Sequence, residues 1–189
     1  MSAVKILVIP GSLRSGSLNA KLAAVAAHAL VQEGAEITRI SLSDFPLPIY
    51  DGDLQAKSGV PKHAVNLKRM MAAHHGVLIV TPEYNSSVPA LVKNTIDWVS
   101  RVQDVHETRG QVFRERVFAI ASASGGRLGG SRARLDRGLH GLRKSVHGEE
   151  GRAQPDDALD AARHRIADVV QLEIDEDLLA AIGEPADQR

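Results

Sequence analysis

The chain of 189 residues is 43% hydrophobic, enough for the core of one α/β domain and too little for a sizeable second domain. Its 23 lysines and arginines balance 23 aspartates and glutamates, so no net charge attracts nucleic acid or an anionic membrane surface. The absence of cysteine excludes a disulfide framework, a thiolate nucleophile and a cysteine-ligated metal, and it is typical of a reducing cytosol.

The chain opens with an apolar run over 4–9, which a Pro-Gly pair closes. The run predicts a strand buried on both faces, since it is far too short to cross a membrane. It lacks a signal-peptide cleavage pattern, so we expect a soluble, intracellular protein located in the cytoplasm. Apolar residues at helical spacing then predict a helix over 18–33, which Gly34 ends, and a short strand over 37–42 follows.

Proline and glycine punctuate the stretch 43–61, which is therefore predicted to be a loop. Four further elements are predicted: a helix from Pro61 to about His75, a strand over 76–81, a helix over 89–99 and a strand over 117–121. Strands that alternate with helices indicate crossover connections. The fold class is therefore α/β, with a parallel sheet and helices on both faces.

The chain beyond about residue 132 departs from this pattern. Residues 132–152 are dense in charge and glycine and offer no convincing fifth strand, although a helical pattern resumes from Ala158. No internal repeat or inter-domain linker is evident. The prediction is a single domain over 1–189, with a doubtful fifth strand and an atypical C-terminal portion from about 132.

Three connections that follow predicted strands are rich in glycine, serine, asparagine or proline: 10–19, 82–87 and 122–131. Ligands of open parallel sheets bind beyond the carboxyl ends of the strands, so we expect these connections to form one site. The first places an arginine, three hydroxyls and two glycines before a helix, a set that suits a phosphate. It matches neither a Walker loop nor a G-x-G-x-x-G fingerprint, and an ordinary capped loop is the alternative interpretation.

The motifs of these connections are GSLR with Ser17 and Asn19, then PEYN followed by SVP, LVKN and DW, then SGG with GGS. Together, over roughly residues 4 to 131, they resemble the NADPH-dependent FMN reductase family. The resemblance implies a flavodoxin-like three-layer sandwich and FMN as the cofactor. It also implies NADPH or NADH as the electron donor, and a homodimer or homotetramer with the flavin near a subunit interface.

The resemblance further implies roles for individual residues. The FMN phosphate is expected on Ser12, Arg14, Ser17, Leu18 and Asn19. The isoalloxazine ring is expected along Pro82, Glu83, Tyr84 and Asn85, and the third connection is expected to close on the ring with Ser122, Ser124 and Gly125. Tyr84 also stands out by composition, because the chain has two tyrosines and only 3% aromatic residues. Helix capping explains Ser86, Ser87 and Pro89 but leaves Tyr84 unexplained.

No residue is predicted to be catalytic, because the flavin itself passes electrons from the nicotinamide to a small acceptor such as a quinone, a flavin, an azo compound or a metal oxyanion. No metal is expected, since the eight histidines lack metal-binding spacing. The arginine-rich stretch 127–143 lacks the aromatics that stack on bases, so no nucleic-acid partner is expected either. Lys93, Asn94, Asp97 and Trp98 are predicted to have mainly structural roles.

Two other functions are compatible with the sequence. The first is a flavodoxin-like electron carrier, which holds FMN without accepting hydride from NAD(P)H. Such carriers tend to be acidic and to sandwich the ring between aromatics, whereas this chain is neutral and offers essentially Tyr84. The second is a regulatory or scaffold protein that keeps the fold without the cofactor.

Overall fold

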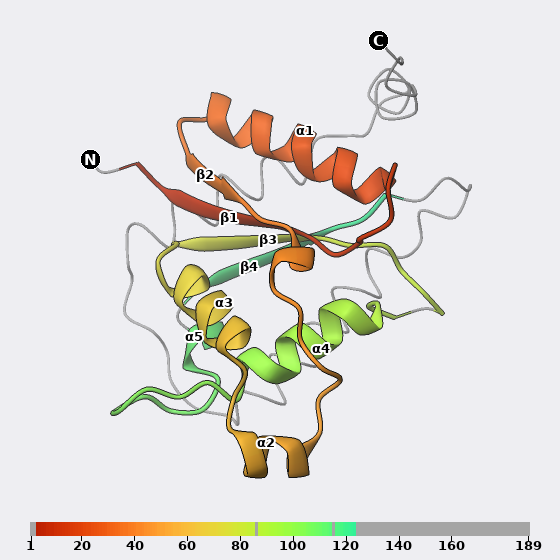
Figure 1. The fold of residues 1–189 in the computed structure, drawn as a ribbon. Coiled ribbons are helices and arrows are strands. Elements are labelled where there is room, and N and C mark those ends of the chain that lie inside the picture. The colour runs from red at the N-terminus through yellow and green to blue at the C-terminus, as the bar shows by residue number, and fades with distance from the viewer. Residues whose placement is uncertain (1–2, 86, 115, 124–189) are drawn as a thin grey trace.

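The computed structural model describes residues 3–85, 87–114 and 116–123 of the chain (Figure 1). Within these residues, four parallel strands form one sheet in the order β2-β1-β3-β4. The strands are β1 (Lys5–Pro10), β2 (Glu36–Arg39), β3 (Gly76–Val80) and β4 (Val117–Ala121). The chain passes from β1 to β2 on one side and later to β3 on the other, so the order reverses between β1 and β3. Doubly wound sheets bind their ligands at this reversal.

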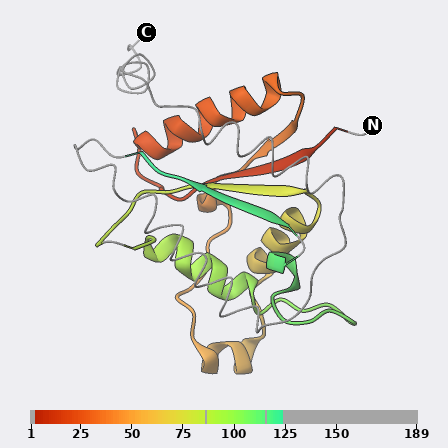
Figure 2. The same ribbon diagram turned by 180° about the vertical axis from the view of Figure 1, so that it is seen from behind.

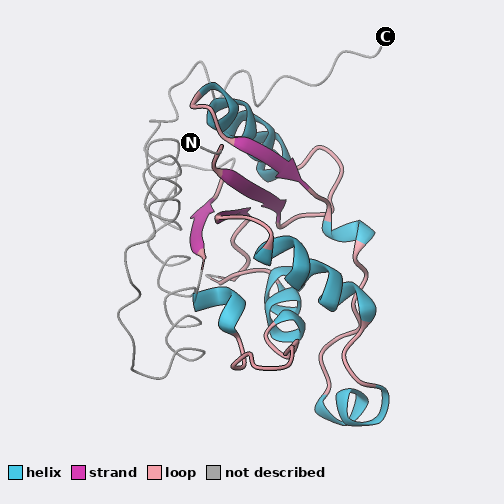
Figure 3. Cartoon of the chain, turned by 90° about the vertical axis from the view of Figure 1, so that its left-hand side faces the viewer, coloured by secondary structure: helices cyan, strands magenta, loops and turns pink. Residues whose placement is uncertain are grey.

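Helices lie on both faces of the sheet, which confirms the predicted fold class (Figures 1 and 2). The helices that cover the sheet are α1 (Leu18–Gln32) on one face, and α3 (Lys62–Ala72), α4 (Ala90–Val99) and the short α5 (Gln111–Arg114) on the other. Figure 3 shows the strands, in magenta, between these two layers of helices. Burial on both faces explains the uninterrupted apolar run of β1. Ile6 and Val8 pack with α1, while Leu7 and Ile9 pack with α3 and α4.

The stretch predicted to be a loop over 43–61 contains a helix, α2 (Gly52–Ser58), so that prediction was wrong there. The Asp51 carboxylate caps α2 by accepting hydrogen bonds from the N–H groups of Asp53 and Leu54, and Gly59 at φ 75° follows its last turn. No residue of α2 is buried, and the helix stands away from the sheet in Figure 1. It therefore carries no apolar stripe for sequence periodicity to detect.

Other boundaries moved by a few residues. The strand predicted over 37–42 ends at Arg39, because Ser41 caps a short 3₁₀ helix, η1 (Leu42–Asp44). The helix predicted from Pro61 ends at Ala72 rather than His75, and Pro89 occupies the N-cap position of α4 rather than its first turn. Helix α5 was not predicted. The stretch 132–152, where a fifth strand was doubtful, and the rest of the C-terminal portion from about 132 lie outside the described residues.

The connection between β2 and α3 is held on α4 by one backbone carbonyl. The Pro48 oxygen accepts hydrogen bonds from Trp98 Nε1 (2.7 Å) and Asn94 Nδ2 (2.9 Å), and Asn94 Oδ1 accepts one from the Tyr50 N–H (2.8 Å). Trp98 is fully buried and meets the Tyr50 ring edge-on at 5.0 Å between centroids. The structural roles predicted for Asn94 and Trp98 are therefore confirmed. Among the described residues, no helix has the length and apolar character needed to cross a membrane.

Lys68 of α3 anchors the connection between α4 and α5. Its side chain is 4% exposed, and its Nζ contacts the carboxylates of Asp104 and Glu107. Burial acts to lower the pKa of Lys68, but the hydrogen bonds and charges of the two carboxylates outweigh it and raise that pKa. Hydrogen bonding to Lys68 in turn lowers the pKa values of Asp104 and Glu107.

Lys68→Met is expected to lower the urea midpoint at pH 7 and to lose less stability than the native chain on acidification. The lowered carboxylate pKa values stabilise the fold above their unfolded values of about 4, and this contribution disappears as the pH falls further. The raised pKa of Lys68 stabilises the fold fully below about pH 10.4, the pKa of an unfolded lysine. This stabilisation is lost as the pH rises through the pKa of Lys68 in the folded protein. Urea unfolding at pH 7 and pH 3 measures the difference in midpoint between Lys68→Met and the native chain. This difference should be smaller at pH 3.

Lys93→Met is the matched control for this experiment. Lys93 pairs with Asp97 one turn further along α4, but both side chains are partly exposed to solvent. Exposed pairs of this spacing stabilise a fold by less than about 1 kcal/mol, so this variant should unfold close to the native chain at both pH values. Equal acid sensitivity of Lys68→Met and the native chain would contradict the role given to Lys68.

Candidate functional site

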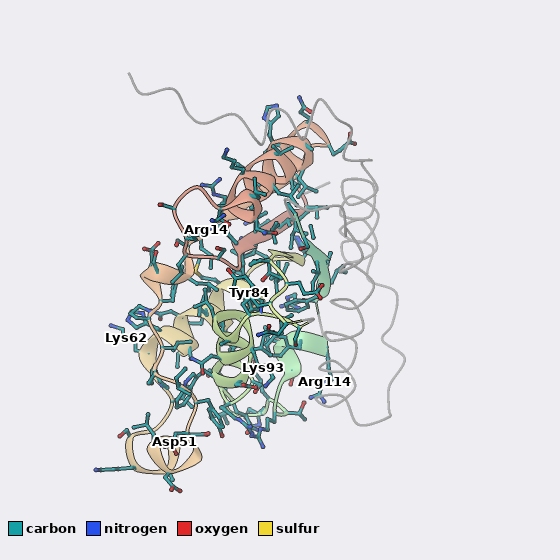
Figure 4. The ribbon with its side chains drawn as sticks, turned by 90° about the vertical axis from the view of Figure 1, so that its right-hand side faces the viewer. Arg14, Asp51, Lys62, Tyr84, Lys93 and Arg114 are labelled. Atoms are coloured by element: carbon teal, nitrogen blue, oxygen red, sulfur yellow. The ribbon has the colours of Figure 1, made fainter. Side chains whose placement is uncertain are left out.

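The first two predicted connections project from the same edge of the sheet. The view in Figure 4 looks toward the carboxyl ends of the strands, and Arg14 of the first connection and Tyr84 of the second both lie on this side of the molecule. Hydrogen bonds fix where the connections begin. The Gly11 N–H donates to the Val80 oxygen (2.7 Å), and the Thr81 N–H donates to the Ala121 oxygen (2.9 Å). The chain therefore leaves β1 and β3 in fixed register with the neighbouring strand.

Gly11 brings the first connection into direct contact with the second. A Cβ at this position would lie 2.6 Å from Thr81 Cβ and 2.7 Å from Val92 Cγ2, and closer still to Thr81 Oγ1. Thr81 is fully buried, so it has little freedom to move aside. The close approach of these two connections therefore requires glycine at position 11.

Local hydrogen bonds shape the first connection. The Ser12 hydroxyl accepts from the Arg14 N–H (3.4 Å), and the Arg14 carbonyl accepts from the Ser17 N–H (3.2 Å). Ser17 is the N-cap of α1, and its hydroxyl accepts from the Ala20 N–H (3.4 Å). The sequence RSGSLN thus closes a compact turn that delivers the chain into the helix.

The groups of this connection fit a phosphate. The N–H groups of Leu18 and Asn19 open α1 and have no intrahelical acceptor because of their position, and the helix N-terminus carries a partial positive charge. The Arg14 side chain is exposed, and hydroxyls of Ser12 and Ser17 lie in the same turn. A guanidinium, hydroxyls and helix N–H groups form the donor set that binds a phosphate ester.

The Asn19 side chain makes a long-range connection that sequence reasoning missed. Its Nδ2 donates to the Ala123 oxygen (2.9 Å), and its Oδ1 accepts from the Ala123 N–H (2.9 Å). Asn19 is only 3% exposed. The amide therefore ties the start of α1 to the chain just beyond β4. No sequence pattern predicts this pair, because its two residues are 104 positions apart and the backbone of Ala123 supplies both partner groups.

The second connection folds back as a tight turn. Tyr84 and Ser87 exchange two backbone hydrogen bonds (3.0 and 3.1 Å), and Asn85 between them has φ 52°. Asparagine tolerates this left-handed conformation better than most residues. The turn leaves Tyr84 55% exposed. One carboxylate oxygen of Glu83, Oε2, is buried and without a hydrogen-bond partner among the described residues.

Most of the predicted site residues lie in the described part of the chain, and their roles toward FMN stay predictions. Those at the carboxyl edge of the sheet, in the described part of the chain, are Ser12, Arg14, Ser17, Leu18, Asn19, Pro82, Glu83, Tyr84, Asn85 and Ser122. Ser124 and Gly125 lie outside the described residues. Sequence reasoning missed Gly11 and Thr81 as the contact between two connections, and Ala123 as the partner of Asn19.

The adjacent histidines have structural partners at the opposite end of the strands. The His74 ring bonds to the Met70 carbonyl and to Thr38 Oγ1, while His75 Nδ1 accepts from the Lys5 N–H (2.9 Å). Within the ranges that the structure describes, no group of three or more histidine, aspartate or glutamate side chains is arranged to hold a metal ion.

Comparisons with known proteins identify the family to which the chain belongs. The profile of the family described as NADPH-dependent FMN reductase matches residues 4–138. A quinone reductase of Escherichia coli (strain K12) is 36% identical over 130 residues, which make up 68% of this chain and 64% of that protein. An NAD(P)H-dependent FMN reductase of Pseudomonas aeruginosa is 39% identical over 130 residues, 69% of this chain and 65% of that protein.

A solved structure shares the fold over most of the chain. FerB of Paracoccus denitrificans, a flavoenzyme NAD(P)H:(acceptor) oxidoreductase, superposes with a TM-score of 0.61 at 26% identity, and the match covers 88% of this chain and 93% of FerB. The alignments with the two bacterial reductases span just under two thirds of their lengths. The family profile matches well over half of the chain, which therefore belongs to the NADPH-dependent FMN reductase family.

Proposed function

We propose that this chain is an FMN-dependent NAD(P)H oxidoreductase, which takes hydride from NADPH or NADH and passes electrons to a small acceptor. The observation that carries the proposal is the joining of three connections at one edge of the sheet, through the contact of Gly11 with Thr81 and the hydrogen bonds of Asn19 with Ala123. Membership of the family supports FMN and NADPH. The names of the two bacterial relatives support a quinone or a flavin as the acceptor.

In this proposal, the residues of this chain bind FMN and orient it. FMN, when bound, supplies the hydride and electron chemistry. Arg14 neutralises phosphate charge, and the first N–H groups of α1 donate hydrogen bonds to the phosphate oxygens. The Tyr84 ring offers a flat apolar face, and the turn that follows Pro82 offers backbone groups.

The remaining assignments complete the ring side of the site. Ser122 directly follows β4, and we assign it to the ring together with Ser124 and Gly125. The acceptor class also includes azo compounds and metal oxyanions. A homodimer or homotetramer in the cytoplasm, with no membrane or nucleic-acid partner, completes the proposal, and light scattering after gel filtration measures the assembly.

Flavin binding and reduction test the proposed function. The purified protein is titrated with FMN, and the loaded protein is mixed anaerobically with NADPH or NADH while the flavin absorbance is recorded. We expect saturable FMN binding, bleaching by at least one nicotinamide, and recovery of the absorbance when a quinone is added. Bound FMN that neither nicotinamide bleaches would favour an electron carrier. A protein that stays colourless after incubation with FMN would contradict the proposal.

A further inference from the structure

We propose that the Asn19 side chain positions the ring side of the flavin site and does not bind the phosphate. The inference rests on the proposed function, since it divides one FMN site into two ends. It departs from the role that the family resemblance implies for this residue. The structure shows why: both polar atoms of the amide already have partners on Ala123, at 2.9 Å each.

The amide is the one side-chain group that matches these partners. Ala123 presents one N–H and one carbonyl, and a side chain that pairs with both needs a donor and an acceptor side by side. Asparagine has both, whereas aspartate has only acceptors when ionised and leucine has neither. Asn19 is 3% exposed, so little water can reach the amide to replace a lost partner, and exchange of either bond for a phosphate oxygen is unfavourable.

The place of Asn19 in the fold joins the two ends of the site. Asn19 is the second residue of α1, and α1 packs over β1 and β3. Ala123 follows β4, which lies beyond β3 in the sheet. The amide therefore joins the start of α1 to the backbone next to Ser122. The backbone N–H of Asn19 faces out of the helix N-terminus, while its side chain fixes the start of the third connection.

This division predicts that ring binding and phosphate binding respond separately to substitution. Asn19→Leu keeps a similar volume but removes both hydrogen bonds, so the backbone of Ala123, next to Ser122, loses its side-chain anchor. We expect about a tenfold or greater loss of affinity for riboflavin, which has the ring but no phosphate. The affinity for inorganic phosphate should stay within about twofold of the native value, because the N–H groups of α1 are unchanged. Arg14→Ala should instead weaken the binding of inorganic phosphate and leave the riboflavin affinity nearly unchanged.

The experiment measures three ligands on each variant of the full chain. FMN and riboflavin are titrated by flavin fluorescence, and inorganic phosphate is measured by its competition with FMN. Asn19→Asp is a second variant, in case Asn19→Leu does not fold. It keeps the bond from the Ala123 N–H but sets a carboxylate oxygen against the Ala123 carbonyl, so its riboflavin affinity should also fall well below that of the native chain. Far-UV circular dichroism checks that each variant is folded.

The outcomes separate this inference from the proposed function. Absence of FMN binding by the native chain would overturn both. FMN binding by the native chain, together with an Asn19→Leu variant that loses phosphate affinity as Arg14→Ala does, would overturn the positioning role alone. Equal losses for riboflavin and phosphate, or unchanged affinity for both, would also overturn it. A selective loss of riboflavin affinity is the result that supports the proposal.

Discussion

Gly11→Ala is expected to destabilise the fold and to abolish FMN binding at micromolar concentrations. The added methyl group would meet Thr81 Cβ at 2.6 Å and Val92 Cγ2 at 2.7 Å, far inside normal contact distances. Both neighbours are buried, so the first connection must move away from the second. Overpacking of this kind typically costs about 1–3 kcal/mol. Urea unfolding measures the loss of stability, and fluorescence titration with FMN measures the loss of binding.

Gly52→Ala is the matched control for this prediction. A Cβ at Gly52 meets nothing within 4 Å, and the residue begins α2, which buries no side chain. Alanine also has the higher helix propensity, so this variant should be as stable as the native chain or slightly more stable. Its FMN affinity should not change. A Gly11→Ala protein that unfolds and binds FMN like Gly52→Ala would show that the two connections do not depend on their close contact.

Arg14→Ala is expected to raise the dissociation constant of FMN by about 10- to 100-fold, the loss of a charge-assisted contact of about 1.5–3 kcal/mol. The Arg14 side chain is exposed, so the free energy of unfolding should change little. The native affinity should also weaken as salt is added, and the variant should be less sensitive to salt. Flavin fluorescence titrations at low and high ionic strength measure both effects.

Two further variants sharpen the test of Arg14. Arg14→Lys keeps the charge but not the planar fork of donors, so its FMN affinity should lie between those of the native chain and Arg14→Ala. Arg109→Ala is the control, because Arg109 is also exposed but lies in the connection that follows α4, at the opposite end of that helix from Tyr84. An FMN dissociation constant that Arg14→Ala leaves unchanged would remove Arg14 from the phosphate site.

The elements best predicted from the sequence are those whose buried residues form a continuous or periodic apolar pattern. Val77 to Val80 of β3 are all buried, and the same apolar run identified the strand. Helix α2 escaped prediction because a carboxylate cap at Asp51 and hydrogen bonds maintain it without an apolar face. Periodicity reports burial, so a helix in which only Leu54 packs partly against the core gives it little signal.

The candidate site was also predicted only in part. The three connections were found because glycine, serine and proline follow strands in the sequence, and parallel topology then brings strand ends together. The contacts that join them were not predictable. Gly11 against Thr81 depends on the spacing of adjacent strands, and Asn19 pairs with backbone groups of Ala123, which any residue other than proline offers. Side-chain partners of this kind appear only when the fold is known.

A crystal structure of the protein grown with FMN tests the central claim most directly. The account predicts that the FMN phosphate lies within hydrogen-bond distance of Arg14 and the first N–H groups of α1, and that the ring lies against the segment from Pro82 to Asn85. The Asn19 amide should remain on Ala123. Density for FMN at any other edge of the sheet, with Arg14 and Tyr84 both free of the ligand, would contradict the account.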